Sequence, residues 1–264
     1  MHYTTGAVIL RSREFGEADR LLTLYTLAEG KVTAKVRGAR RPSTRLGGST
    51  LALSHVEVML WRGRSSIETL TQAVPCDAWQ PIRDDLHRLA YASFAVEMID
   101  LMCEEREPDP ETYLMLLQTM NLIAYGERPD VAAYSLALRL LRSAGLLAPI
   151  DRCVSCGGAG AGGVGQSPLL SWSTARAGLL CSACEPVVTG GAAAEPRRLL
   201  RPDSLAVLGK LVEGSPRMLA ALRPAAVVGE QLRGVVWDCL RVNMERTPKS
   251  LSLLDSLPTG GGFG

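Results

Sequence analysis

The sequence predicts an α+β protein of several domains, in which a small five-stranded β-barrel precedes a mainly α-helical domain with an inserted four-cysteine zinc ribbon. Three observations predict this fold class. β-rich runs separated by glycine-containing turns fill residues 1–80, helical periodicity begins near Pro81, and two Cys-x-x-Cys pairs interrupt the helical part. With 264 residues and 47% hydrophobic content, the chain can bury a sizeable core in more than one compact unit.

The barrel is predicted from five short runs of β-forming residues bounded by turn signals. These runs span residues 5–10, 21–27, 31–37, 53–61 and 65–74. In the third run Val32, Ala34 and Val36 alternate with polar or basic residues, as a strand with one buried face requires. We therefore expect this strand to present a basic outer face.

Helical spacing of apolar residues predicts the remaining elements. Helices are expected over residues 81–105, 110–125, 129–144, 202–212, 215–222 and 225–246. Asp109 is the predicted N-cap of the second helix, with Pro110 in its first turn. The predicted organisation is a barrel at 1–80, a helical domain at 81–152 and 189–258, a zinc ribbon at 153–188 and a flexible glycine-rich tail at 259–264.

The cysteine spacing is the most specific motif in the chain. Cys153 and Cys156 form one Cys-x-x-Cys pair, and Cys181 and Cys184 form the second after 24 intervening residues. Two such pairs supply the four tetrahedral ligands of a structural zinc ion and leave no position open for an activated water. Two disulfides, four free thiols, or a vestigial site that has lost its metal are the alternatives. No secretory leader is recognisable at the N-terminus, so metal is favoured over disulfides.

Three further cysteines stand alone in the sequence. Cys76, Cys103 and Cys239 lie in apolar or helical surroundings, where we expect buried and inert thiols.

The charge is unevenly distributed along the chain, although the net charge is only +2. Residues 1–80 carry net +4, residues 81–150 net −5 and residues 151–264 net +3. Between Lys31 and Arg64 eight basic side chains accompany the single acid Glu57. Such a cluster attracts phosphate groups and favours nucleic-acid binding, with a solvated basic loop as the alternative.

Aromatic side chains near this cluster decide whether bases could stack on the protein. Phe15, Tyr25 and Trp61 are the candidates, and we expect each of them to belong to the core. Phosphate contact should therefore dominate over base stacking.

Catalytic motifs are sparse, and we expect no enzyme. The histidines His2, His55 and His87 have no nucleophile or carboxylate partner in a recognisable motif, and no phosphate-binding loop motif is found. The acidic residues between 104 and 111 are typical of a solvated connection rather than a metal centre. No apolar run approaches the length of a membrane span.

Six short segments follow one another in a characteristic order. They are Gly16-Glu17-Ala18-Asp19-Arg20-Leu21-Leu22-Thr23-Leu24, Arg37-Gly38-Ala39-Arg40-Arg41-Pro42, Leu70-Thr71-Gln72-Ala73, Asp84-Asp85-Leu86-His87-Arg88-Leu89-Ala90-Tyr91, Ala148-Pro149-Ile150-Asp151-Arg152-Cys153 and Pro248-Lys249-Ser250-Leu251. In this order they resemble bacterial RecO proteins, and the resemblance covers nearly the whole chain. It combines a basic barrel, a helical domain and zinc-ribbon spacing.

The resemblance implies an N-terminal oligonucleotide/oligosaccharide-binding (OB) barrel and a recombination mediator in DNA repair. Such proteins bind single- and double-stranded DNA, anneal strands, engage single-stranded-DNA-binding protein and RecR, and promote RecA loading, with RecF and RecA as indirect partners. A cytoplasmic, nucleoid-associated protein is expected. The side chains expected to neutralise phosphates are Lys35, Arg37, Arg40, Arg41, Arg45, Arg62 and Arg64.

The resemblance also implies a groove in the helical domain for the acidic, apolar C-terminal tail of single-stranded-DNA-binding protein. Arg139 and Arg142 are the candidate cations, with a core-packing helix that exposes two arginines as the alternative. Two other functions remain open: a zinc-ribbon RNA-binding or transcription-associated protein, and a zinc-stabilised protein adaptor. Salt-sensitive DNA binding would argue against the adaptor, and discrimination of ribose from deoxyribose would favour the RNA-binding protein.

Overall fold

The computed structural model describes residues 1–39, 50–158, 170–190 and 194–257. The chain divides into two compact units. One comprises Met1–Pro129 with Pro248–Leu254, and the other comprises Asp130–Thr247 with Asp255–Gly264. None of the helices within these described ranges is both long and apolar enough to cross a membrane.

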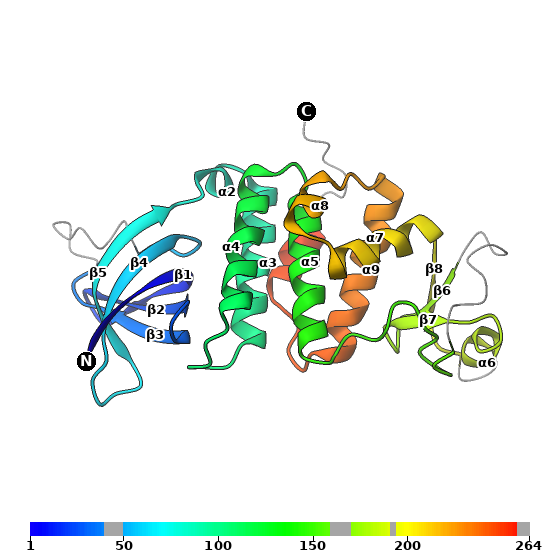
Figure 1. Cartoon of the computed structure of the whole chain (residues 1–264), viewed down its shortest axis with the longest axis horizontal. Coiled ribbons are helices and arrows are strands. Elements are labelled where there is room, and N and C mark those ends of the chain that lie inside the picture. Colours follow the sequence, from blue (N-terminus) through cyan, green and yellow to red (C-terminus); the bar gives the residue numbers. More distant parts are fainter. Residues whose placement is uncertain (40–49, 159–169, 191–193, 258–264) are drawn as a thin grey trace. The chain divides into compact units, whose positions relative to one another are not determined.

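The N-terminal strands form a closed five-stranded barrel (Figure 1). The strands are β1 (His2–Phe15), β2 (Asp19–Thr26), β3 (Gly30–Val36), β4 (His55–Trp61) and β5 (Glu68–Asp77), in the spatial order β1-β2-β3-β5-β4. All neighbours pair antiparallel except β3 and β5, which pair in parallel. This architecture is that of an OB-type barrel, so the predicted fold class is confirmed.

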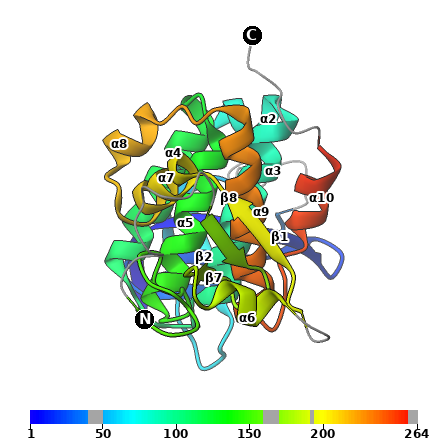
Figure 2. The same cartoon turned by 90° about the vertical axis from the view of Figure 1, so that its right-hand side faces the viewer.

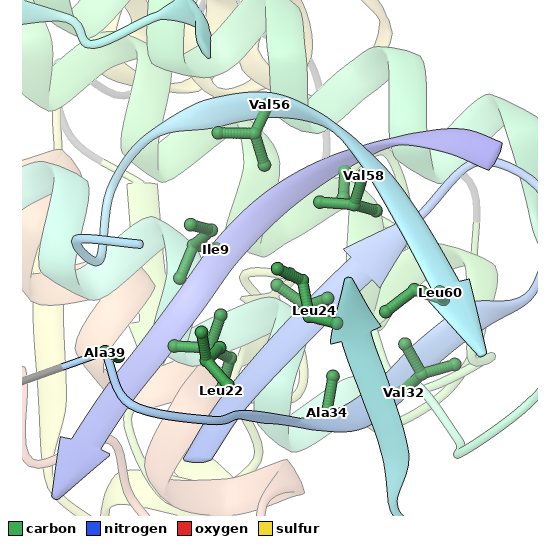
Figure 3. Close-up of a cluster of buried hydrophobic side chains, with 12 residues drawn as sticks. Ile9, Leu22, Leu24, Val32, Ala34, Ala39, Val56, Val58 and Leu60 are labelled. Atoms are coloured by element: carbon green, nitrogen blue, oxygen red, sulfur yellow. The ribbon is translucent and has the colours of Figure 1, made fainter. Parts of the chain in front are cut away.

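The interior of the barrel is filled by aliphatic side chains from every strand (Figure 3). On β3 the inward residues Val32, Ala34 and Val36 are buried, and the residues between them are partly exposed, as the alternation predicts. Leu22 and Leu24 of β2 face the same core and are fully buried. The barrel therefore holds itself together by apolar burial around a closed ring of hydrogen-bonded strands.

Two strand boundaries differ from the prediction for identifiable reasons. The strand expected from residue 53 begins at His55, because Leu53 has a left-handed backbone with φ of 59°. The first strand continues well past residue 10 to Phe15, through a register shift between Ile9 and Arg11. Such a bulge lets a strand bend without ending, so the polar residues after Leu10 remain in the sheet.

Three helices follow the barrel in the same unit: α2 (Gln80–Asp84), α3 (Leu86–Met102) and α4 (Pro110–Tyr125). Asp109 caps α4 through hydrogen bonds from the amides of Glu111 and Thr112, which confirms the predicted helix start. The short helix α10 (Ser250–Ser256) was not predicted. Its first residues belong to the barrel unit, because the amides of Lys249 and Ser250 donate to the carboxylate of Glu97 on α3.

The second unit is mainly helical, with α5 (Pro129–Ser143), α7 (Pro202–Glu213), α8 (Pro216–Ala221) and α9 (Ala226–Asn243). The Tyr134 ring of α5 meets the Trp237 ring of α9 edge to face, with centroids 5.7 Å apart. The hydroxyl of Ser135 donates to the carbonyl of Leu211 on α7 at 2.6 Å. These contacts join three helices around one apolar core.

A small antiparallel sheet lies between α5 and α7 in the sequence. It consists of β7 (Gly178–Leu180), β6 (Leu170–Ser173) and β8 (Arg197–Leu200) in that spatial order, with the short helix α6 (Glu185–Thr189) beside it (Figure 2). Arg197 of β8 forms an ion pair with Glu185 of α6. The sequence analysis missed β7, β8 and α6, each of which has only three to five residues.

Candidate metal centre and nucleic-acid interface

Four cysteines from two turns converge at one point of the second unit. All four Sγ atoms lie within 4.8 Å of one another, and the Sγ atoms of Cys156 and Cys181 are 3.8 Å apart. A tetrahedral zinc ion with Zn–S distances of about 2.3 Å places its sulfurs about 3.8 Å apart. Cys153, Cys156, Cys181 and Cys184 therefore form a cluster that fits a metal ion.

Backbone hydrogen bonds shape the two Cys-x-x-Cys turns. The amide of Gly157 donates to the carbonyl of Cys153 at 2.8 Å, and the amide of Cys184 donates to the carbonyl of Cys181 at 3.1 Å. The amide of Cys181 also donates to Sγ of Cys153 at 3.4 Å, which connects the two turns directly. Gly157 has a φ of +70°, a conformation that glycine adopts at little steric cost.

Two of the four thiols have pKa values shifted in opposite directions by their surroundings. Burial raises the pKa of Cys153, but hydrogen bonds from the amides of Cys181, Cys156 and Ser155 outweigh it and lower this pKa to about 6. Side-chain hydrogen bonds with Cys181 and Cys156 raise the pKa of Cys184 to about 12. A divalent cation would lower the pKa values of all four cysteines, because it stabilises the four thiolates together. With four protein sulfurs no coordination position remains for a reacting water.

The sheet beside the cysteine turns (β6–β8) is connected to α9 by an ion pair between a partly exposed arginine and a buried carboxylate. The guanidinium of Arg198 on β8 donates to both carboxylate oxygens of Asp238, at 2.6 and 3.1 Å, and Asp238 is only 3% exposed. Gly234 leaves room for this contact, because a Cβ there would lie 2.8 Å from the guanidinium carbon. The position of β8 is thus fixed to the helical core.

The three remaining cysteines differ from one another. Cys239 is fully buried, and burial raises its pKa to about 12, as expected for an inert thiol. Cys103 is partly buried, whereas Cys76 on β5 is exposed, so the prediction of a buried thiol was wrong for Cys76.

Lys35 and Arg37 lie at the end of β3 where the predicted nucleic-acid surface begins. Lys35 is paired with Asp19 at 2.8 Å and lies over the Phe15 ring, 5.1 Å from its centroid. Asp19 also accepts the amide of Gly38 at 2.8 Å, so it secures the start of the connection after β3. Lys35 and Gly38 together hold the pKa of Asp19 below its usual value. Arg37 is exposed.

The two arginines of the β4–β5 turn have different surroundings. Arg62 forms ion pairs with Glu29 and with the fully buried Glu68, and its guanidinium lies over the Tyr3 ring. Arg64 is exposed. Arg62 is therefore held inside a charged network, whereas Arg64 is presented to solvent.

The other predicted phosphate contacts, Arg40, Arg41 and Arg45, lie outside the described residues. The aromatic prediction was partly wrong. Tyr25 is buried as expected, but Phe15 and Trp61 are each 42% exposed. Trp61 packs against Gly63, where a Cβ would lie 2.8 Å from the indole ring.

Further basic residues of β1 face outward and were missed by the sequence analysis. Arg11 and Arg13 are both exposed and follow the bulge. Arg11 pairs with Asp100 of α3 at 2.7 Å, and Lys31 donates to the carbonyl of Asp100 at 2.6 Å. Arg11 and Arg13 are two residues apart, and this spacing could have indicated that both lie on one face of a strand that continues past Leu10. In the structure Arg13 lies in register with Leu21 on β2.

The two arginines predicted to bind a partner tail lie at the end of α5. Arg139 is partly buried, whereas Arg142 is exposed and lies 3.7 Å from Glu213 of α7. Both project from a helix whose other residues from 131 to 141 are buried. The helix is therefore a core helix that presents two cations near its C-terminal end.

Comparison with known proteins identifies the family of this chain. Residues 1–79 match the family model described as recombination protein O N terminal, and residues 83–252 match the model described as recombination protein O C terminal. The chain belongs to the RecO family. It is 31% identical to the DNA repair protein RecO of Symbiobacterium thermophilum over 97% of each chain.

Similar relatives extend across other bacteria. The DNA repair protein RecO of a Nocardioides strain is 31% identical over 97% of this chain and 100% of its own. That of a Roseiflexus strain is also 31% identical, over 97% and 86%. The match to the C-terminal family model covers residues 83–252. It therefore includes the four cysteines and the segment around Lys249 that contacts α3.

Proposed function

We propose that this RecO family member is a DNA-binding and strand-annealing recombination mediator in recombinational DNA repair. It engages single-stranded-DNA-binding protein and RecR and promotes RecA loading, with RecF as a further indirect partner, and it catalyses no covalent step. The observation that carries the proposal is a closed OB-type barrel with outward basic side chains, in a chain that matches DNA repair relatives over 97% of its length. Its expected place of action is the bacterial cytoplasm, at the nucleoid.

The barrel would bind DNA through phosphate groups rather than bases. Arg37 and Arg64 are exposed and Lys35 is partly exposed, so these residues can meet a polyanion directly. Arg40, Arg41 and Arg45 belong to the same proposed surface. Arg62 would contribute to this surface by position, because its ion pairs with Glu29 and Glu68 hold the turn that carries Arg64. Contacts of this kind neutralise two strands without reading their sequence, which suits annealing.

Zinc would act as a structural ion in the four-cysteine cluster. Its contribution would be to hold the two turns together, while the residues of the helical unit would contact protein partners. Arg139 and Arg142 are the proposed cations for the acidic tail of single-stranded-DNA-binding protein, which needs positive charge beside an apolar surface.

Annealing of complementary DNA strands coated with single-stranded-DNA-binding protein tests the proposal. The wild-type protein should accelerate annealing in a salt-sensitive manner, and deletion of the tail of the coating protein should remove most of the acceleration. Arg37→Ala with Arg40→Ala should weaken both DNA binding and annealing. A matched double variant, Lys210→Ala with Arg217→Ala, removes the same charge from exposed positions on α7 and α8.

The outcomes separate the candidate functions. Retained annealing in the folded Arg37/Arg40 variant would contradict the DNA surface. No acceleration by folded, metal-loaded wild type would contradict the mediator function, and binding that requires ribose would favour an RNA-binding protein.

A further inference from the structure

A pocket of about 280 Å³ lies on the outside of the barrel unit. Its apolar lining includes Leu10 of β1, Leu53 before β4 and Val96 of α3, and its polar lining includes Arg11 and Lys249. All of these residues belong to one compact unit. The volume is slightly below the range of about 300–1,000 Å³ that is typical for drug-sized ligands, so the pocket has room for one small group.

The chain brings Lys249 to this pocket from far away in the sequence. The two carboxylate oxygens of Glu97 accept the amides of Lys249 and Ser250, at 3.0 and 2.8 Å. Pro248 is buried, whereas the side chain of Lys249 is exposed. The backbone of the segment is therefore fixed to α3, and the ammonium group is left at the pocket.

One positive charge at the rim of the pocket remains available to an anion, although the carboxylate of Glu97 also lines the pocket. Burial would raise the pKa of Glu97, but hydrogen bonds from the Ser250 and Lys249 backbone lower it, so this carboxylate is ionised and already engaged. Arg11 shares its charge with Asp100. Within the described residues Lys249 has no ion-pair partner, so its charge is available to a ligand.

The pocket wall is held in an unusual conformation. Leu53 has a left-handed backbone with a φ of 59°. The guanidinium of Arg83 donates hydrogen bonds to the carbonyls of Ala52 and Leu53 and to the hydroxyl of Ser54. The amide of Leu53 donates to the carbonyl of Ile9 on β1 at 2.9 Å. Left-handed backbone at a leucine is costly and is retained where the surroundings enforce it, often at ligand sites. The wall is thus held in place by hydrogen bonds from Arg83 and to β1.

We propose that this pocket binds one nucleotide of single-stranded DNA, with the base against Leu10, Leu53 and Val96 and a phosphate at Lys249 beside Arg11. The inference rests on the proposed DNA-binding function and deepens it. It also gives the Pro248-Lys249-Ser250-Leu251 segment a role, because this segment completes a barrel site that the N-terminal strands form only in part.

The phosphate contact is tested by binding of an oligothymidylate over a salt series. Lys249→Ala should weaken binding and reduce the slope of log K against log salt by about 0.7, the value for one phosphate contact on a single strand. Lys249→Arg should restore it, and Lys210→Ala, which removes an exposed lysine from α7, should behave as wild type. An unchanged affinity and slope in Lys249→Ala would overturn the proposal.

The base contact is tested with 2-aminopurine placed in turn at each position of the oligonucleotide. In the wild-type complex one position should be protected from acrylamide quenching. Filling the pocket with Ala52→Phe, or with Ser93→Phe if the first variant does not fold, should abolish that protection. Equal quenching at all positions, or protection that persists in the folded filled variant, would overturn the base site.

Failure of this proposal differs from failure of the proposed function. If wild type binds no DNA at low salt, the mediator function itself falls. If wild type binds and Lys249→Ala binds equally well, only the pocket is refuted.

Discussion

The barrel and the four-cysteine sheet are both small β-structures, but they are stabilised in different ways. The barrel closes on itself, and among the described residues it encloses a cluster of 12 buried hydrophobic side chains, 11 from the five strands and Ala39 from the turn after β3 (Figure 3). Within the described part of the chain, the buried cluster at the cysteines consists of Cys153, Leu180 and Val188, with Val154, Cys181 and Cys184 packed against it. The barrel therefore depends on apolar burial. The strands β6–β8 also bury apolar side chains, among them Trp172 and Leu179, but the two cysteine turns have little apolar core of their own, so we expect a bound metal ion to cross-link them.

Metal removal should produce the largest difference between the two structures. Cys153→Ser should lower bound zinc from about one ion per chain to near zero, because three thiolates bind a structural ion far less tightly than four. Hydrogen-exchange protection of β6–β8 should then be lost, while β1–β5 retain theirs. Metal analysis and exchange measured by mass spectrometry check both statements. Cys76→Ser, which removes an exposed thiol outside the cluster, is the matched control.

Protection of β6–β8 that survives complete metal removal would contradict this comparison. It would mean that the sheet is held by its attachment to α9 through Arg198 and Asp238.

A cavity in the barrel core should have the opposite effect to metal removal: it should destabilise the barrel and leave the metal content unchanged. Leu24→Ala removes a fully buried side chain, and we expect it to lower the free energy of unfolding by about 2–5 kcal/mol. Zinc content should not change. Leu27→Ala, in the turn after β2 and 41% exposed, should change stability by less than about 0.5 kcal/mol. Denaturant unfolding followed with metal analysis measures both effects, and equal destabilisation by the two variants would contradict a core role for Leu24.

The charged network of the barrel should make its stability sensitive to acid. Burial raises the pKa of Glu68, but hydrogen bonds from Tyr3, Arg106 and Arg62 outweigh it and lower this pKa below 4.5. The stabilisation is therefore complete above about pH 4.5 and is lost as the pH falls through the folded-state pKa. Glu68→Gln should cost about 1–3 kcal/mol at pH 7, because it leaves charged donors poorly satisfied.

Unfolding measured at several pH values checks the sign of this effect. The difference in stability between wild type and Glu68→Gln should shrink as the pH falls from 6 to about 3. A constant difference over that range would mean that Glu68 does not titrate with folding.

Much of the barrel could be predicted from the sequence, because alternation and glycine turns are local signals. The same holds for the cysteine spacing, whose four sulfurs the structure brings together. The boundary at Leu53 could not be predicted, because its left-handed conformation is enforced by Arg83, 30 residues later. α10 was missed because seven residues carry little periodic signal.

The charges of the barrel were the hardest feature to interpret from sequence. Arg62 counts as one more basic residue in a cluster, yet its partner Glu29 lies before that cluster and Glu68 after it. Asp100 pairs with Arg11 across 89 residues, so no local pattern reports it. Counting charges therefore locates a basic region, but pairing decides which cations are available.

The smallest predicted effect concerns one such pair. Asp19→Asn removes the charge that holds Lys35, while its amide oxygen can still accept the amide of Gly38. If the barrel's basic face binds DNA, the freed ammonium group should add up to one phosphate contact. Affinity for single-stranded DNA should then rise, and the slope of log K against log salt should steepen by at most about 0.7. Thermal stability should change little, because the pair is partly exposed to solvent.

Fluorescence titration over a salt series, paired with a thermal melt, measures both quantities. Asp203→Asn, which removes an exposed carboxylate paired with Arg201 in the helical unit, is the matched control and should leave DNA binding unchanged. Weaker binding by Asp19→Asn would mean that Asp19 serves DNA binding by ordering Gly38 and the connection after β3. If affinity for single-stranded DNA rises in Asp19→Asn and not in Asp203→Asn, the DNA phosphates contact the barrel near Lys35 rather than the helical unit with its four cysteines.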